Sequence, residues 1–205
     1  MTETKNRLQY LESICKGKTV FHCGALEGED TRTISQLSNN WLHARLKKSA
    51  KKVIGIDIVS DEDNNIFRLD LEDAYEFRLF AYSYVQYDYI ILGEVIEHLF
   101  NPGIVLDNLK LISGELVITT PNAYSIRKFI YALFGREVVS TSRTCYYSFK
   151  TLEYLLRKHG YEVLKKETYS YLGRFGFIQK AFYKLFPLLT DGIIVHAKKN
   201  TIATK

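Results

Sequence analysis

Short apolar runs alternate with longer stretches of helical period along this chain. Most of the short runs are rich in Val, Ile and aromatic residues, so they predict seven β-strands. These are Lys18–Cys23, Lys52–Asp57, Ile66–Leu69, Tyr87–Leu92, Gly114–Thr119, Tyr161–Thr168 and Gly192–Ala197. The first five lack a clear alternation of polar and apolar positions, which is typical of strands buried on both faces of a helix-covered parallel sheet.

Longer stretches between these runs predict helices. Thr31–Lys48 has apolar residues at helical spacing up to Trp41 and beyond. Asn101–Leu111 carries a proline in its first turn, where proline is tolerated, and Phe149–His159 is followed by a glycine, a normal helix stop. With a further helix at about residues 4–15, this strand–helix alternation predicts an α/β sandwich with right-handed crossovers.

Two places depart from simple alternation. The last two strands flank a predicted inserted helix at about residues 174–188, so we expect them to form an antiparallel pair at the sheet end. Only about eight residues separate Asp57 from the third strand, too few for a crossover helix, so this connection must be a loop. The expected sheet is therefore mostly parallel and seven-stranded, with an antiparallel last strand and helices on both faces.

Composition places the chain among ordinary globular proteins. A length of 205 residues, with three prolines and no Gly/Ser-rich run, predicts a single domain over residues 1–205. The formal net charge of +5 is modest and mixed along the chain, which does not favour nucleic acid as a partner. Three cysteines without C-x-x-C spacing favour a reducing compartment, and the chain shows no signal core or long apolar run, so we expect a cytoplasmic protein.

Polar and glycine residues stand where the predicted strands end, which is where ligands bind in an open α/β sheet. Gly24 and Gly28 follow the first strand, Asp57 ends the second, and Asp70 follows the third. Gly24 permits a tight turn and a close approach of the backbone to a ligand. Asp57 could accept both hydroxyls of a ribose, and Asp70 could accept from an adenine amine.

The loop after the first strand argues against a phosphate-bearing cofactor. It lacks the G-x-x-x-x-G-K-[ST] pattern of a triphosphate loop, and Leu26 and Glu29 replace the glycines that a pyrophosphate would need. Glu27, Glu29 and Asp30 make the loop acidic, a poor cradle for phosphate but an acceptable neighbour for a cation. S-adenosylmethionine, which has an adenosine, a positive centre and no phosphate, meets these conditions.

With these features the sequence resembles the class I S-adenosylmethionine-dependent methyltransferases over nearly its whole length. It looks most like their small-molecule and glycan-pathway branch. The stretches that carry the resemblance are "TVFHCGALEG", "KKVIGIDIV", "YDYIILGEVIEHLFNPGIVL", "GELVITTPNAYS" and "YYSFKTLEYLLRKHGYEV". The resemblance implies a Rossmann-like fold, S-adenosylmethionine as cofactor and S-adenosylhomocysteine as product.

The resemblance also implies site residues. The glycine loop would hold the methionine part of the cofactor, Asp57 the ribose, Asp70 the adenine, and Gly93–Glu94 the cleft floor. The full set of expected cofactor contacts is His22, Gly24, Ala25, Gly28, Asp57, Ile58, Asp70, Leu71, Gly93 and Glu94. The expected acceptor contacts are Asn122, Tyr124, Arg143 and Tyr146.

Three positions depart from the family pattern. His22 stands where an acid is common, Leu26 replaces the middle glycine, and Arg143 lies where similar sequences often have a histidine. His22 in an apolar strand is typical of a packed, hydrogen-bonded histidine, although its place at a strand end leaves room for a cofactor contact. We interpret His43 as a helix-surface or interface residue.

Methyl transfer to a hydroxyl needs alignment of the reactants and benefits from a general base. "GEVIEHL" offers Glu94, Glu97 and His98. We predict His98 as the base, since histidine titrates in the right range, and Glu94 as the second catalytic residue. The competing interpretation is that Glu97 and His98 brace the helix that follows them.

The expected function is therefore O-methylation of a sugar, a glycolipid precursor or another small metabolite. One alternative is an RNA 3′-terminal 2′-O-methyltransferase, in which Glu94, Glu97 and His98 would hold a metal; no metal is expected in the preferred interpretation. A second alternative is a methyltransferase-like binding module without turnover. The sequence leaves the oligomeric state open.

Two aromatic-rich segments, "SIRKFIYALFGREVV" and "RFGFIQKAFYKLFPLL", flank the last strands. Such stripes usually belong to a core. Here their mixture of aromatic and basic residues also permits an acceptor lid or a peripheral contact with a membrane or a lipid-linked substrate.

Overall fold

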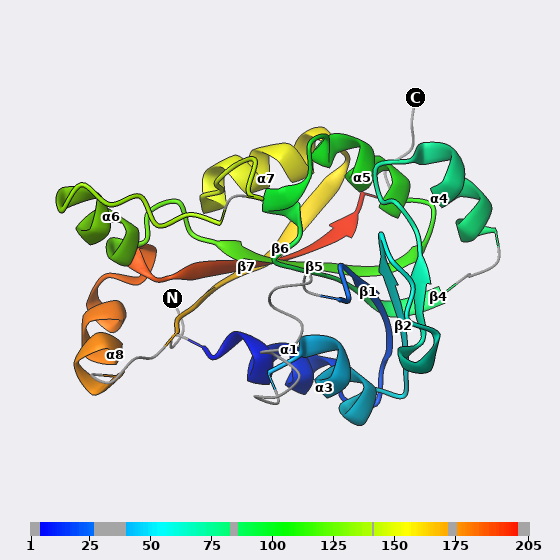
Figure 1. The fold of residues 1–205 in the computed structure, drawn as a ribbon, viewed down its shortest axis with the longest axis horizontal. Coiled ribbons are helices and arrows are strands. Elements are labelled where there is room, and N and C mark those ends of the chain that lie inside the picture. The colour runs from blue at the N-terminus through cyan, green and yellow to red at the C-terminus, as the bar shows by residue number, and fades with distance from the viewer. Residues whose placement is uncertain (1–4, 27–39, 83–85, 141, 172–175, 201–205) are drawn as a thin grey trace.

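The computed structural model describes residues 5–26, 40–82, 86–140, 142–171 and 176–200, and within them seven strands form one sheet in the order β3-β2-β1-β4-β5-β7-β6 (Figure 1). The strands are β1 Thr19–Cys23, β2 Lys52–Asp57, β3 Ile66–Arg68, β4 Gln86–Gly93, β5 Ser113–Pro121, β6 Tyr161–Tyr169 and β7 Gly192–Lys199. The first five pair in parallel, and β7 is antiparallel to both β5 and β6. This confirms the predicted fold class and all seven predicted strands.

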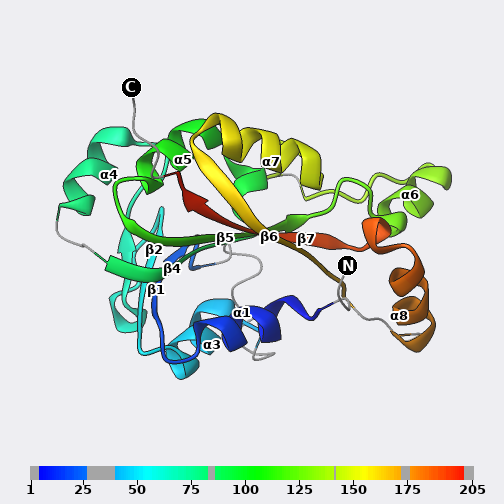
Figure 2. The same cartoon turned by 180° about the vertical axis from the view of Figure 1, so that it is seen from behind.

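Helices cover both faces of the sheet (Figures 1 and 2). One face carries α1 (Arg7–Cys15) and α3 (Leu42–Ser49). The other carries α4 (Ala74–Ala81), α5 (Pro102–Leu109) and α7 (Phe149–Lys158). At the end of the molecule away from α4 lie α6 (Ile126–Leu133) and α8 (Gly176–Leu185). Three short 3-10 turns, η1 (Glu62–Asn64), η2 (Ile96–His98) and η3 (Pro187–Leu189), complete the described elements.

The central strands are buried on both faces, as their unbroken apolar runs predict. In β1, Phe21 belongs to the core beneath α4, α5 and α7, whereas its neighbour Val20 belongs to the core beneath α1 and α3. Leu92 and Ile91 divide in the same way in β4. Because successive side chains of a strand point to opposite faces, each run serves two cores and needs no polar positions.

The predicted loop between the second and third strands is confirmed, since η1 is the element that connects β2 to β3. The inserted segment before β7 is also present, as α8 followed by η3. The N-terminal helix begins at Arg7.

The prediction of one helix over Thr31–Lys48 is wrong in the part that the structure describes, and its earlier residues lie outside the described ranges. Trp41 has extended backbone angles, φ −67° and ψ 113°, so α3 begins only at Leu42. The Trp41 indole nitrogen donates to the Ala25 carbonyl at 2.7 Å, which holds this residue against the loop after β1. The interpretation of His43 as a surface residue is also wrong, because its side chain is 0% exposed.

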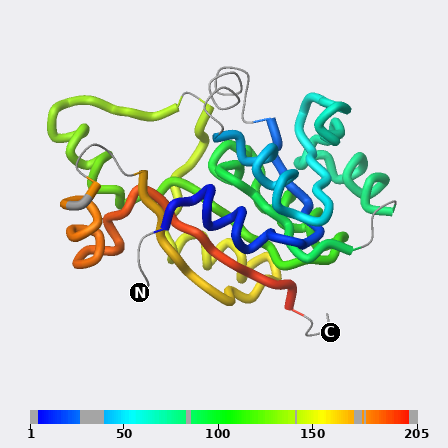
Figure 3. The backbone as a smooth tube through the Cα atoms, turned by 90° about the horizontal axis from the view of Figure 1, so that it is seen from below, coloured from blue at the N-terminus to red at the C-terminus, as the bar shows by residue number. Residues whose placement is uncertain are grey.

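The N-terminal segment reaches back to the last strands, which bears on the site. Lys5 pairs with Tyr169 at the end of β6, and the Tyr10 hydroxyl lies 2.8 Å from Nε2 of His196 in β7. Figure 3 shows α1 running along β7 when the molecule is seen from below. These contacts carry Arg7, the first residue of α1, to the carboxyl ends of the central strands.

Candidate active site

The carboxyl ends of β1, β2 and β4 meet at one edge of the sheet, and the glycine after β1 permits their close approach. Gly24 has φ +69°, and a Cβ added there would lie 2.3 Å from Cγ2 of Val95. The amides of Gly24 and Ala25 donate to the Ile56 carbonyl in β2 at 2.9 and 3.1 Å. A side chain would clash and strain this turn, so glycine keeps the backbone open to a ligand.

Asp57 links the first two strand ends. Its Oδ2 accepts a hydrogen bond from the Leu26 amide and its Oδ1 accepts one from the Ile58 amide, both at 2.8 Å. Each carboxylate oxygen retains a second lone pair, so Asp57 can still accept from the hydroxyls of a ligand. The Ile58 side chain, 70% exposed, adds an apolar surface directly beside this carboxylate.

Two acidic side chains, Asp70 and Glu76, fix the turn after β3 by accepting hydrogen bonds from backbone amides. Asp70 is exposed, and its Oδ1 accepts from the Glu72 amide at 2.9 Å while its own amide donates to Glu76 at 3.1 Å. Leu71 is buried beneath it. The Asp70 carboxylate therefore keeps acceptor capacity on the outside of the turn. Gly28, which is also a predicted cofactor contact, lies outside the residues that the structure describes.

His22 is buried in a stack with His43. The rings lie nearly parallel, 5.4 Å apart between centroids, and their Nδ1 atoms are 3.1 Å apart. Nε2 of His43 donates to the Asn64 carbonyl at 2.8 Å, so in the neutral ring its Nδ1 accepts from Nδ1 of His22. Burial first, then His43 and Arg7, hold the pKa of His22 well below its ordinary value.

That tautomer leaves Nε2 of His22 as an acceptor. The atom is buried and has no hydrogen-bond partner within the described residues. A Cβ added to Gly93 would lie 3.7 Å from it, which places this nitrogen beside the predicted cleft floor. The site thus offers a single acceptor here, where the family pattern has an acid.

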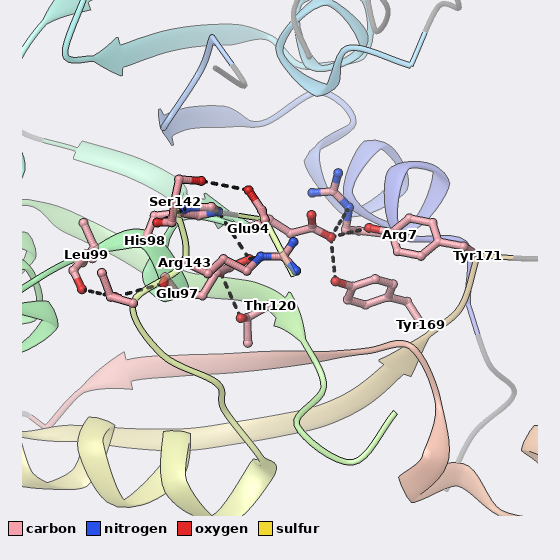
Figure 4. A network of polar contacts seen from close by, with 12 residues as sticks. Arg7, Glu94, Glu97, His98, Leu99, Thr120, Ser142, Arg143, Tyr169 and Tyr171 are labelled. Atoms are coloured by element: carbon pink, nitrogen blue, oxygen red, sulfur yellow. Dashed lines mark hydrogen bonds and ion pairs between the residues drawn. The ribbon is translucent and has the colours of Figure 1, made fainter. Parts of the chain in front are cut away.

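Glu94 directly follows β4 and has a left-handed conformation, φ +60°, that is uncommon for a non-glycine residue. Its carboxylate accepts hydrogen bonds from the hydroxyls of Tyr169, at 2.7 Å, and Tyr171, and Nε of Arg7 lies 3.5 Å away (Figure 4). Burial alone would raise the pKa of Glu94, but Arg7 and the two tyrosines hold it below its ordinary value. Glu94 is therefore an ionised group fixed by donors from α1 and from β6 and the residues after it.

Glu97, three residues later, has the opposite surroundings. Its side chain is 1% exposed, and its Oε2 accepts from the Thr120 hydroxyl at 2.9 Å. The nearest cationic or titratable nitrogens to its Oε1, Nε2 of His98 and Nε of Arg143, are both 3.9 Å away, beyond hydrogen-bond distance. Burial, and then the charge of Glu94, raise the pKa of Glu97 to about 7.

His98 lies next to this carboxylate with one ring nitrogen fixed. Its Nδ1 is 3.0 Å from the Ser142 carbonyl, which can only accept, so Nδ1 carries the proton and Nε2 is the acceptor in the neutral ring. The His98 side chain is 33% exposed. Thr144 secures the same turn, because its hydroxyl donates to the Leu99 carbonyl at 2.7 Å and its amide to the Glu97 carbonyl at 2.8 Å.

The structure does not assemble the metal site of the RNA alternative. Glu94 is directed to Arg7 and the tyrosines, whereas Glu97 is directed to Thr120. Among the residues that the structure describes, no three His, Cys, Asp or Glu side chains lie where they could hold one metal ion.

The predicted acceptor residues separate into two groups. The Asn122 side chain is buried and donates to the Leu188 and Thr190 carbonyls at 2.8 and 2.9 Å, and its oxygen accepts from the Tyr124 amide. Its polar atoms therefore serve the turn between β5 and α6, and the Tyr124 side chain points to solvent. Arg143, by contrast, lies beside Glu97 within the site.

Tyr146 lines a cavity of about 440 Å³ together with residues of α6 and residues 135–139. Lys128 of α6, which was not predicted, lies over the Tyr146 ring with Nζ 4.0 Å from its centroid and donates to the Asn122 carbonyl at 3.1 Å. Burial, and then the charge of Arg143, lower the pKa of Lys128 to about 8. Ala123, Ala132, Val138 and Val139 make most of the cavity apolar.

Sequence reasoning missed Arg7, Tyr169 and Tyr171 as well as Lys128. The first three surround Glu94 but come from the two ends of the chain. No local pattern marks them, since they meet Glu94 only after α1 has packed against the last strands.

A family model described as a methyltransferase domain matches residues 28–166. The chain belongs to this family. Its fold is that of solved methyltransferases with bound S-adenosylhomocysteine. No curated protein matches the sequence.

Solved structures share the fold at low sequence identity. The small RNA methyltransferase HEN1 superposes with a TM-score of 0.61 at 14% identity, covering 97% of this chain and 25% of that one. Magnesium protoporphyrin IX methyltransferase from Synechocystis PCC 6803, with bound S-adenosylhomocysteine, gives a TM-score of 0.59 at 13% identity, covering 95% and 84%. The N-methyltransferase NodS from Bradyrhizobium japonicum WM9, also with S-adenosylhomocysteine, gives 0.52 at 12% identity, covering 94% and 84%. This chain spans a quarter of the HEN1 chain.

The residues at the strand ends fit S-adenosylmethionine as a cofactor. A Cβ would close the turn at Gly24, the Asp57 carboxylate retains lone pairs for ribose hydroxyls, and the buried Nε2 of His22 can accept from a donor such as an ammonium group. S-adenosylmethionine supplies an electrophilic methyl group on a sulfonium. The predicted contacts at Ile58, Asp70 and Gly93 would complete the site.

Of the helices in the described ranges, none has the length and apolar character needed to cross a bilayer.

Proposed function

We propose that this protein transfers a methyl group from S-adenosylmethionine to a hydroxyl of a small acceptor, namely a sugar, a glycolipid precursor or another small metabolite. In this reaction the methyl–sulfur bond breaks as the methyl–oxygen bond forms, and the acceptor proton passes to the protein. His98 receives that proton.

The fixed tautomer of His98 supports this role most directly. Because Nδ1 donates to the Ser142 carbonyl, Nε2 bears the lone pair. A general base needs an available lone pair held in one direction, and a carbonyl partner at the other ring nitrogen provides it. The partial exposure of the ring leaves a path to an acceptor.

Glu97 supports the same proposal from the other side of His98. Its Oε1 lies 3.9 Å from Nε2 of His98, close enough for its charge to stabilise an imidazolium ion after proton transfer. With a pKa of about 7, Glu97 can also take up the proton near neutral pH. Arg143, at the same distance from Oε1, balances the charge of this carboxylate.

The cavity beside α6 suits the acceptor. Its walls are mostly apolar, and Lys128, Arg136 and Glu137 place polar groups on its lining. An apolar pocket with a few polar groups is the common form of a small-molecule site. It would admit an acceptor with an apolar part and hydroxyl or acidic groups.

The first test is calorimetric titration with S-adenosylmethionine and S-adenosylhomocysteine, followed by a screen of hydroxyl acceptors with radiolabelled methyl donor. We expect micromolar cofactor binding and transfer to a small hydroxyl compound. Transfer to the 3′ end of RNA, abolished by a chelator, would instead support the RNA alternative. Cofactor binding without transfer to any acceptor would support a binding module.

The second test replaces the proposed base. His98→Ala should lower turnover by about 10²–10⁴-fold and leave cofactor affinity within a few fold. The control is His159→Ala, because His159 pairs with Asp107 on α5, away from the site. Equal turnover in His98→Ala and the wild type would remove His98 from the mechanism.

A further inference from the structure

Helix α6 turns its apolar side outward. Ile126, Phe129, Ile130 and Leu133 recur at the spacing of one helical face, and the last three are exposed, Leu133 by 67%. Lys128 and Ala132, on the opposite side of the helix, line the cavity. None of the residues of this helix is buried. An amphipathic helix normally buries its apolar face, so this face is built for a partner outside the domain.

Helix α8 repeats the arrangement. Tyr183 is its buried anchor, and its hydroxyl lies 3.3 Å from Asp191. Ile178 and Leu185, seven residues apart and therefore on one face, are exposed by 66% and 76%. Exposed Phe186 and Leu188 continue this apolar surface into η3.

Both helices lie at the same end of the molecule, opposite α4, in every view (Figures 1, 2 and 3). The end face consists of the exposed apolar residues of α6, α8 and η3, and we call it the α6–α8 face. A hydrogen bond links α6 to the chain before α8, because Nη2 of Arg127 donates to the Tyr171 carbonyl at 3.0 Å.

Helices α6 and α8 carry basic residues and no acidic residue, and one exposed acid, Glu137, follows Arg136 just past the end of α6. Residues 126–136 and 176–190 contain five basic residues and no acidic residue: Arg127, Lys128, Arg136, Lys180 and Lys184. Arg127 is paired with Asp191 and Lys128 faces the cavity. The outward charges are those of the exposed Arg136, Lys180 and Lys184 together with Glu137, so the surface is net positive.

We propose that the α6–α8 face docks on the surface of an anionic membrane. Exposed phenylalanine and leucine side chains would enter the boundary between headgroups and acyl chains, while the flanking lysines and arginine would contact acidic headgroups. This combination of apolar stripe and basic flank favours an anionic bilayer over an uncharged protein partner. The proposal does not depend on the acceptor chemistry, although the cavity beside α6 would then open next to the membrane.

The experiment is cosedimentation of the full chain with vesicles. Vesicles of phosphatidylcholine alone are compared with vesicles of phosphatidylcholine and phosphatidylglycerol. We expect binding to the anionic vesicles that weakens as salt is raised, and little binding to the neutral vesicles. Equal binding to both would contradict the role given to the basic residues.

Substitutions test whether the α6–α8 face, and not another part of the surface, binds the vesicles. Leu133→Glu and Leu185→Glu should each reduce vesicle binding by about tenfold or more, because each places a charge in the apolar stripe. Lys180→Gln and Lys184→Gln should each reduce it by about fivefold. The matched control is Leu79→Glu on α4, a leucine exposed by 55% at the opposite end, which should bind vesicles as the wild type does.

Two outcomes would overturn the proposal. In the first, the wild type does not bind anionic vesicles although S-adenosylhomocysteine titration shows that it is folded. In the second, light scattering shows a dimer that Leu133→Glu converts to a monomer without any vesicle binding, so that a second copy covers the α6–α8 face. Cofactor titration of each variant checks that the cofactor site is intact.

Discussion

The surroundings of Glu94 and of Glu97 differ although both residues follow β4 within four positions. Glu94 meets a guanidinium and two phenol hydroxyls, and its pKa is held below the ordinary value. Glu97 is almost fully buried and accepts one hydrogen bond from a hydroxyl, and its pKa rises to about 7. One short segment therefore carries a carboxylate that is ionised at neutral pH and one that changes its charge near neutral pH.

This contrast shows how long-range packing gives two identical side chains different chemistry. The partners of Glu94 come from α1 and from Tyr169 and Tyr171 near the end of β6, whereas Glu97 belongs to η2 and lies against Thr120 and Arg143. The first carboxylate adds to the repulsion that keeps the second protonated. Titratable pairs with separated pKa values are a common basis for acid–base assignments in enzymes.

Glu97→Gln tests the contrast with the largest expected effect. The folded-state pKa of Glu97 exceeds the ordinary 4.5, so the fold is favoured while Glu97 is protonated and loses that advantage as pH rises toward 7. Glutamine removes the cost of ionising a buried carboxyl group. The free energy of unfolding of the variant should therefore exceed that of the wild type by about 3 kcal/mol at pH 8 and by about 1 kcal/mol or less at pH 5. Urea denaturation at both pH values measures this.

Glu162→Gln, at an exposed position of β6, is the control for that experiment, with an expected change within about 0.5 kcal/mol at both pH values. A Glu97→Gln variant that is less stable than the wild type at pH 8 would mean that Glu97 is ionised and well solvated in the fold. Turnover of the variant should also fall, because the carboxylate beside His98 is lost.

Glu94→Gln should lower the free energy of unfolding, whereas Glu97→Gln should raise it. Two hydroxyl donors and one guanidinium lose a charged partner, so the free energy of unfolding should fall by about 2 kcal/mol at pH 7. Because the pKa of Glu94 is lowered, its contribution is present above the ordinary 4.5 and is lost as pH falls. The difference between variant and wild type should therefore shrink in acid; a constant difference from pH 7 to pH 3 would contradict the ion pair.

Tyr171→Phe has the smallest expected effect. It removes one hydroxyl donor to Glu94 at a half-exposed position and leaves Arg7 and Tyr169 in place. We expect a loss of about 1 kcal/mol in the free energy of unfolding at pH 7 and a small rise in the pKa of Glu94. Thermal denaturation of Tyr171→Phe and of the control Tyr75→Phe, an exposed tyrosine of α4, would measure the difference.

The fold was largely predictable because strands buried on both faces leave uninterrupted apolar runs. The short connection after Asp57 also allowed the loop to be inferred. Two helices were not predicted, for different physical reasons. Only Phe77 of α4 is buried, so its sequence shows little apolar stripe, and α6 has a strong stripe that faces outward instead of into the core. The break before α3 depends on the hydrogen bond from Trp41 to Ala25, which no local pattern reveals.

The candidate site was predictable where it follows strand ends. Gly24, Asp57, Glu94 and His98 lie at the same edge of the sheet because parallel strands end there together. The partners of these residues could not be predicted, since Arg7 and Tyr169 are about 160 positions apart in the sequence. The burial of His43 likewise depends on its stack with His22 across β1 and α3.

The most direct test of this account is a pH titration of the glutamate carboxyl carbons by ¹³C NMR, with Glu94→Gln and Glu97→Gln used to assign the two signals. The account predicts that the signal lost in Glu97→Gln has a midpoint near 7, and that the signal lost in Glu94→Gln has a midpoint below 4.5. Two midpoints that both lie near 4.5 would show that the fold does not separate the two carboxylates, and the proton-accepting role of Glu97 beside His98 would then be wrong.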